Sequence, residues 1–245
     1  DEIKYLKKYL KNKDMDTAIL ELKRGIPVQY IVGDVDFYKY NFIVNQNVLI
    51  PRFETEELVD NTIRYIKANF SGEVKIIDVG CGSGAIGITL AKELENAKVT
   101  CLDISDAALD VTRENAKRLN VPINVLKGDM LDYVNDKYDV VISNPPYIAT
   151  DEEIEDIVKN NEPHLALYSG EDGMDSYRQI FSKIKNVIND KYLIALEIGC
   201  TQKEAVTNII KKSLPDAVVT CTKDLSGRDR TVSYTHLRAH ETGRN

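Results

Sequence analysis

Asp78-Val79-Gly80-Cys81-Gly82-Ser83-Gly84-Ala85 is the stretch that decides the fold of this chain. It closes the apolar run 74–79, which is typical of a buried strand, and it opens a helical pattern over 85–95. Glycines permit a tight turn and let a ligand approach the backbone closely, and the following helix offers free N–H groups at its start. The stretch therefore predicts a strand–turn–helix unit that binds a nucleotide-like ligand. A tight turn without a ligand is the alternative.

Other nucleotide-binding and catalytic loops do not match these residues. The stretch lacks the G-K-[ST] end of a phosphate-binding loop. It also lacks the G-x-S-x-G spacing of a nucleophile elbow. Nicotinamide enzymes and methyltransferases both use a G-x-G-x-G turn, so the turn alone does not separate these two classes.

From residue 74 onward the chain alternates between strand and helix patterns. The last two expected strands leave no room for a helix between them, so they form an antiparallel pair. This order predicts a three-layer α/β fold with a mostly parallel sheet and an antiparallel last strand. The expected strands are 74–79, 98–102, 123–126, 138–143, 192–198, 217–221 and 230–234, and the expected helices are 85–95, 105–119, 177–188 and 202–212.

The residues before this core divide into three parts. Residues 1–27 have two short amphipathic helical pieces, capped between them by Asp14 or Asp16, and too few apolar residues for a core of their own. Residues 28–50 are rich in β-forming runs, including Tyr30-Ile31-Val32, and predict a small hairpin that Pro51 ends. A helix from Glu54 to about residue 69 follows, with acidic residues in its first turn. The chain does not begin with Met, so we expect a piece to be missing before residue 1.

Composition limits the classes of protein that fit. Hydrophobic residues make up 43% of the chain and charged residues 29%, as in ordinary globular proteins rather than disordered ones. No apolar stretch approaches the roughly 20 residues that span a bilayer. The net charge of −7 argues against nucleic acid as the main partner. The four cysteines lie far apart, which predicts buried, reduced cytoplasmic thiols rather than a zinc site or a disulfide scaffold.

The polar stretch 235–245 breaks the pattern, and we expect it to be a non-native tail. Its His236 and His240 are spaced four apart, as two metal ligands on a helix would be. The glutamate of a zinc-protease motif is misplaced, so we expect no metal site.

Two acidic residues are candidates for contacts with a nucleoside. Asp103 ends the strand after the glycine turn, 23 residues beyond Gly80, where a carboxylate can accept hydrogen bonds from both ribose hydroxyls. A helix-capping role is the alternative for Asp103. Asp129 follows the third strand of the core and could accept from the amine of adenine, with Met130 against the ring; an ordinary loop aspartate is the alternative.

The motif Asn144-Pro145-Pro146-Tyr147 follows the apolar strand 138–143 and carries the most chemical information. Two prolines remove backbone donors and stiffen the chain. The Asn144 side-chain oxygen and the Pro145 carbonyl can then act as fixed acceptors for the two N–H groups of a planar –NH2, with Tyr147 against its plane. An amide nitrogen is a poor nucleophile, and acceptors that draw its hydrogens out of the plane direct its lone pair at a methyl donor.

Together, D-x-G-x-G-x-G and N-P-P-Y resemble the methyltransferases that act on amino groups of DNA, RNA or glutamine amides. Further segments over about residues 22–232 are similar to the glutamine methyltransferases of peptide chain release factors. These segments are Gly25–Gly33, Leu49–Glu56, Arg113–Ala116, Glu162-Pro163, Asp172-Gly173 and Asp224–Arg230.

The resemblance implies a Rossmann-like class I methyltransferase domain over 51–234, preceded by a hairpin linker (28–50) and the remnant of a helical domain (1–27). It implies transfer of a methyl group from S-adenosylmethionine to the N5 nitrogen of the glutamine in a release factor Gly-Gly-Gln motif, in translation termination. We expect a cytoplasmic monomer whose partner is the release factor, with no membrane or nucleic-acid substrate.

The resemblance also implies the site residues. The implied cofactor contacts are Gly80, Cys81, Gly82, Ser83, Gly84, Asp103, Ile104, Asp129, Met130 and Asn144. The glutamine amide would be held by the implied catalytic residues Asn144, Pro145, Pro146 and Tyr147, with Arg52, Glu54 and Thr55 near the entrance.

One departure from the family pattern lies at the entrance, where Phe53 replaces the second proline of P-R-P-E-T-E. Three other functions stay open at this point. They are methylation of a ribosomal-protein glutamine, methylation of a nucleic-acid amine such as adenine N6, and cofactor binding without catalysis.

Overall fold

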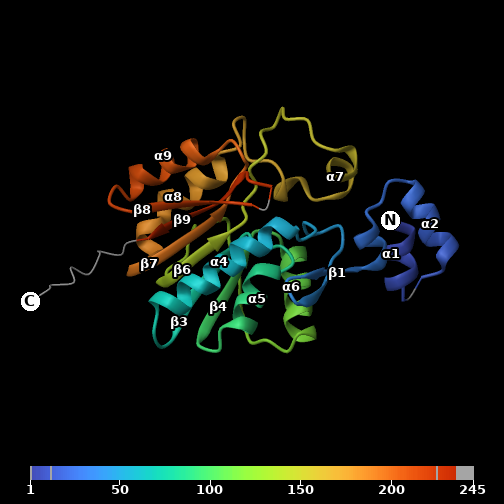
Figure 1. Ribbon diagram of the computed structural model, residues 1–245, viewed down its shortest axis with the longest axis horizontal. Helices are drawn as coiled ribbons and strands as arrows, with labels where there is room; N and C mark the ends of the chain where they lie inside the picture. Colours follow the sequence, from blue (N-terminus) through green and yellow to red (C-terminus); the bar gives the residue numbers. More distant parts are fainter. Residues whose placement is uncertain (1, 12, 225, 236–245) are drawn as a thin grey trace, which may run out of the picture.

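The computed structural model of the protein describes residues 2–11, 13–224 and 226–235. Its centre is a seven-stranded sheet covered by helices on both faces (Figure 1). From one edge to the other, the strands are β5 (Asn124–Lys127), β4 (Ala97–Asp103), β3 (Val74–Val79), β6 (Tyr138–Ser143), β7 (Ile188–Glu197), β9 (Asp229–Thr235) and β8 (Val218–Lys223).

The strand directions match the sequence prediction. The first five strands of that order pair in parallel, whereas β9 pairs antiparallel with both β7 and β8. The predicted mostly parallel sheet with an antiparallel last strand is therefore confirmed.

Alternation along the strands divides the core into two layers. Ile76 packs in the cluster that contains α4 (Phe53–Asn69), α5 (Ala85–Glu93) and α6 (Asp106–Arg118). Its neighbour Ile77 packs in the cluster that contains α8 (Asp175–Val187) and α9 (Lys203–Ser213). Successive side chains of a strand point to opposite faces, so the unbroken apolar run of β3 is explained by helices on both sides.

The N-terminal residues form a small helical unit beside a hairpin (Figure 1). Helices α1 (Glu2–Tyr9) and α2 (Met15–Lys23) correspond to the two expected amphipathic pieces. Asp14 caps α2 by accepting a hydrogen bond from the Thr17 N–H, 2.9 Å away. The hairpin consists of β1 (Asp34–Phe37) and β2 (Tyr40–Ile43).

The expectation of an extended run at Tyr30-Ile31-Val32 is wrong. These residues belong to the short helix α3 (Val28–Val32), which Gly33 ends in a left-handed conformation. Val28 and Ile31 are three residues apart, so a helix places both on one face, where they pack in a cluster with Leu6. This tertiary contact overrides the β propensity of the run. Within 28–50 the expected hairpin is therefore limited to β1 and β2.

Two further differences concern the second half of the chain. The segment after β6 contains α7 (Asp156–Asn161) and the 3-10 helix η1 (His164–Ala166), which the sequence pattern does not predict. Thr235, assigned to the tail, instead pairs with Leu193 and Val218 as the last residue of β9. The rest of the expected tail, with His236 and His240, lies outside the described residues.

Within the described ranges, helices are too short or too polar to cross a bilayer. All four cysteines carry free thiols.

Asn115 of α6 ties the hairpin to the glycine turn. Its side-chain amide donates to the carbonyls of Ile43 (3.0 Å) and Ser83 (2.9 Å), and its oxygen accepts from the Ile43 N–H at 2.6 Å. Asn115 is fully buried, so its removal leaves buried backbone groups of Ile43 and Ser83 without this protein partner.

We expect Asn115→Ala to lower the free energy of unfolding by about 1–3 kcal/mol, since buried polar groups lose their partner. Urea denaturation measures this change. The control is Glu114→Ala on the exposed side of the same helix, which should change stability by less than about 0.5 kcal/mol. Equal effects of the two substitutions would contradict a structural role for the Asn115 amide.

Candidate active site

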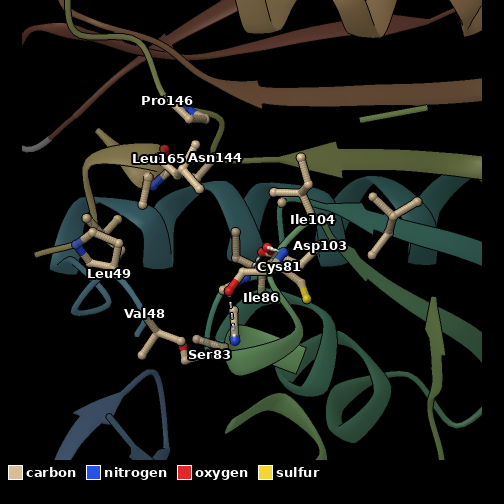
Figure 2. Close-up of a pocket in the computed structure, with 18 of the residues that line it drawn as sticks. Val48, Leu49, Cys81, Ser83, Ile86, Asp103, Ile104, Asn144, Pro146 and Leu165 are labelled. Atoms are coloured by element: carbon tan, nitrogen blue, oxygen red, sulfur yellow. Dashed lines mark hydrogen bonds between the residues drawn. The ribbon is translucent and has the colours of Figure 1, made fainter. Parts of the chain in front are cut away.

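A pocket opens at the carboxyl ends of β3, β4, β5 and β6, the edge of the sheet where the sequence places its motifs (Figure 2). It brings together twelve of the predicted site residues. They are Arg52, Thr55, Gly80, Cys81, Gly82, Ser83, Asp103, Ile104, Asp129, Met130, Asn144 and Pro146. In parallel sheets this edge is the usual ligand site.

The glycine turn leaves its backbone open to the pocket. Gly82 has φ of +54°, a left-handed conformation that a side chain would strain, and a Cβ built there meets no atom within 4 Å. The Thr112 hydroxyl donates to the Gly82 carbonyl at 2.8 Å and holds the turn in place. Gly84 lies outside the pocket lining, and a Cβ there would come within 2.9 Å of Ile88 and Thr112. Gly84 therefore serves the packing of α5 and α6.

Asp103 is held rigidly at the pocket wall. Its Oδ2 accepts from the Gly82 N–H and its Oδ1 from the Ser105 N–H, both at 2.9 Å. Burial raises the pKa of Asp103, and the backbone N–H groups that it accepts from oppose that rise. Each oxygen retains a lone pair for a further donor. The helix cap falls to Ser105, whose hydroxyl accepts from the Ala108 N–H.

Apolar side chains face the same space. Ile104 lines the pocket and is 46% exposed. Met130 also lines it and has φ of +46°, a conformation that non-glycine residues rarely adopt. Asp129 lines the pocket and is exposed. These residues together can accept a flat heterocycle with polar edges.

The Asn144-Pro145-Pro146-Tyr147 motif leaves β6 beside the glycine turn. The side chains of Asn144 and Pro146 line the pocket, whereas Pro145 is buried and the half-buried Tyr147, next to Pro146 in the chain, is outside the lining. Gln202 donates to the Tyr147 carbonyl at 2.7 Å and fixes the end of the motif. Burial, with the nearby Glu197 carboxyl, raises the pKa of Tyr147 to about 12, so its phenol stays protonated at neutral pH.

The entrance residues come from the N-cap and the first turn of α4. Arg52 pairs with the buried Glu162 at 2.5 Å, and Glu162 also accepts from the Ile50 N–H at 3.1 Å. Thr55 is buried in the first turn of α4. Glu54 is exposed and lies outside the pocket lining.

Sequence reasoning missed two parts of the wall. Phe37 of the hairpin and the loop residues Asn47, Val48 and Leu49 close one side. Pro163, Leu165 and Ala166, around η1, close another, and Leu165 is 71% exposed. Leu49 and Pro163 fall within segments that resemble the family, which was the available signal. Neither wall has a motif of its own, because its residues meet the pocket only through tertiary folding.

Comparisons with known proteins agree with this geometry. Residues 55–166 match the family model of the methyltransferase small domain. A T. thermophilus 16S rRNA N2 G1207 methyltransferase, solved in complex with AdoMet and guanosine, aligns with a TM-score of 0.59. The alignment covers 82% of this chain and 49% of that chain at 10% identity, so the likeness concerns the fold.

Two relatives are much more similar in sequence. A release factor glutamine methyltransferase of Bacillus anthracis is 42% identical over 214 residues, which is 85% of this chain and 76% of the relative. One of Streptococcus pneumoniae is 43% identical over 208 residues, 84% of this chain and 74% of the relative. With this identity over most of both chains, and a pocket that joins the glycine turn to Asn144, the chain belongs to the release factor glutamine methyltransferase family.

Proposed function

We propose that this protein methylates the side-chain amide nitrogen, N5, of the glutamine in the Gly-Gly-Gln motif of peptide chain release factors. The methyl donor is S-adenosylmethionine. One observation carries the proposal: Asn144 and Pro146, from the motif after β6, line the same pocket as the glycine turn and Asp103. Membership of the family supports the choice of a release factor glutamine as substrate.

The pocket fits the donor. The open face of Gly82 admits a ligand against the backbone, and the Asp103 carboxylate has lone pairs free for two ribose hydroxyls. Ile104 and Met130 offer apolar contact for adenine, with Asp129 as acceptor for its amine. Cys81 and Ser83, which belong to the turn, also line the pocket. S-adenosylmethionine, when bound, supplies a methyl group on a positively charged sulfur.

The residues after β6 prepare the acceptor. Asn144 Oδ1 and the Pro145 carbonyl accept the two hydrogens of the glutamine amide, and Pro146 and Tyr147 hold the planar group from the side. This arrangement orients the nitrogen lone pair and disfavours the flat, resonance-stabilised amide. The nitrogen loses one proton to solvent after it gains the methyl group, so the reaction needs no protein base, metal ion or covalent enzyme intermediate.

The surroundings of the pocket suit a protein loop as substrate. Arg52 lies at the entrance with Glu54 exposed nearby in the sequence, and the buried Thr55 lines the pocket wall below them. Residues 51–234 form the catalytic domain in this proposal, residues 28–50 a linker that includes the hairpin, and residues 1–27 part of a helical domain. The protein acts as a cytoplasmic monomer on the release factor.

The first prediction concerns the donor. We expect Asp103→Asn to raise the dissociation constant of S-adenosylmethionine by about 10-fold or more, because an amide cannot accept at both ends as a carboxylate does. Isothermal titration calorimetry measures the constant. The matched control is Asp106→Asn, which removes an exposed carboxylate that pairs with Lys127 and lies at the start of α6, three residues after Asp103. Equal binding by the two variants would contradict the role of Asp103.

The second prediction concerns the acceptor. We expect Asn144→Ala to lower kcat for release factor methylation by roughly 10²- to 10³-fold, the usual cost of losing one preorganised hydrogen-bonding group. S-adenosylmethionine should still bind. The control is Asn189→Ala. Asn189 also donates a hydrogen bond, to Asp139, but it lies near the start of β7, at the edge of the sheet opposite the pocket.

Intact-mass spectrometry provides the assay, with a release factor, ribosomal proteins and an adenine-rich oligonucleotide as candidate acceptors. A single added methyl group on the Gly-Gly-Gln glutamine supports the proposal. A gain of mass on the oligonucleotide or a ribosomal protein, but not on the release factor, would refute it.

A further inference from the structure

Three elements that are far apart in the sequence meet behind Asn144. Asn144 follows β6, Glu197 ends β7, and Thr55 lies in the first turn of α4. Strands β6 and β7 pair in parallel with Ser143 opposite Leu196, so Asn144 and Glu197, the next residue of each chain segment, lie at the same level of this sheet edge. Thr55 and Glu197 are 4% and 2% exposed, and Glu197 does not line the pocket.

A chain of two hydrogen bonds joins these side chains. The Asn144 Nδ2 donates to the Thr55 Oγ1 at 3.2 Å. The Thr55 hydroxyl donates to the Glu197 Oε2 at 2.7 Å. The chain thus runs from a residue of the pocket wall to a buried carboxyl group.

The direction of this chain follows from its last member. An ionised carboxylate only accepts, and a threonine hydroxyl has a single proton. Because Thr55 uses that proton to donate a hydrogen bond to Glu197, its oxygen can only accept a hydrogen bond from Asn144. The Asn144 amide must then turn its NH2 group to Thr55, which leaves Oδ1 directed away from Thr55. Without the chain, rotation by 180° about the last side-chain bond would exchange the two ends of the amide.

We propose that Thr55 and Glu197 are positioning residues, which fix the Asn144 amide so that its oxygen, and not its nitrogen, faces the substrate glutamine. The inference rests on the proposed function, because a glutamine amide is the group that requires an acceptor at this place. Neither residue touches the reacting atoms.

Burial and the groups around Glu197 together place its pKa near neutral pH. Burial raises the pKa of Glu197 to about 7, and Glu54 adds to the rise. The Thr55 hydroxyl, Arg230 of β9 and Arg52 oppose it. The buried phenols of Tyr147 and Tyr177 lie beside the same carboxyl, and the Tyr177 hydroxyl donates to the Glu197 carbonyl.

Protonation would reverse the chain. A protonated Glu197 can donate to Thr55, and Thr55 can then donate to the Asn144 oxygen, which turns the NH2 group towards the substrate. The productive orientation is therefore present above the pKa of Glu197 and lost below it. We expect kcat to fall as the pH is lowered through about 7, while the dissociation constant of S-adenosylmethionine changes little.

The test compares two threonines of α4. Thr55→Val removes the hydroxyl and keeps the shape, and Thr62→Val is the matched control, since Thr62 is 2% exposed and its hydroxyl has no partner among the described residues. We expect Thr55→Val to lower kcat on the release factor about 10- to 100-fold, as misplacement of a substrate-holding group does. Thr62→Val should leave kcat unchanged, and Thr55→Ser should restore most of what Thr55→Val loses.

Glu197→Gln gives a second, independent variant. It removes the titrating group, so the inflection of kcat near pH 7 should disappear. The proposal is overturned if Thr55→Val and Thr62→Val have equal kcat values, if Glu197→Gln retains the inflection, or if Thr55→Val weakens S-adenosylmethionine binding as much as it lowers kcat.

Nuclear magnetic resonance separates this inference from the proposed function. The Asn144 side-chain amide of the ¹⁵N-labelled protein, assigned by its loss in Asn144→Ala, should exchange slowly with solvent and become fast in Thr55→Val. Fast exchange in the unsubstituted protein would refute the positioning role. If the unsubstituted protein leaves the release factor unmethylated but shows slow exchange, the proposed function fails and the hydrogen-bonded chain stands.

Discussion

The parallel pairing of the two central strands is the constraint on which the site depends, and the Ser143 hydroxyl adds a hydrogen bond of 2.6 Å to the Val79 carbonyl at their ends. Strands β3 and β6 pair in parallel, with Asp78 opposite Ile142. Their ends therefore coincide, and Asn144 leaves the sheet beside the glycine turn. A parallel sheet gives this arrangement directly, because every strand releases its loop at the same edge. The two groups that must meet in methyl transfer are thus set side by side by backbone pairing.

The hairpin, the loop before α4 and the segment after β6 form the rest of the site beside the sheet edge. Asn115 connects the glycine turn to the hairpin, and Glu162 connects Arg52 and the loop before α4 to the segment that follows β6. Buried acids perform two separate tasks here. Asp103 faces the pocket with its lone pairs, whereas Glu197 lies behind it and acts through Thr55. Burial raises the pKa of both carboxyls, as expected where charge is kept away from water.

The sequence predicts the structural elements that depend on local sequence patterns. The strand–turn–helix at 78–85 and the apolar run of β6 are both local, and the structure has them. The expectation of an extended run at Tyr30-Ile31-Val32 was wrong because packing against Leu6 overrides local propensity. The wall formed by Asn47 to Leu49 and by η1 has no periodicity to reveal it. The chain from Asn144 through Thr55 to Glu197 spans 142 residues of sequence, and only the folded structure brings its members together.

A crystal structure of the protein with S-adenosylhomocysteine and a Gly-Gly-Gln peptide tests the central claim most directly. The account predicts the glutamine amide in the pocket of Figure 2, with its nitrogen about 3 Å from Asn144 Oδ1 and from the Pro145 carbonyl. It also predicts that Asn144 Nδ2 remains bonded to Thr55. A glutamine bound away from Asn144, or an Asn144 amide that presents its nitrogen to the peptide, would contradict the account.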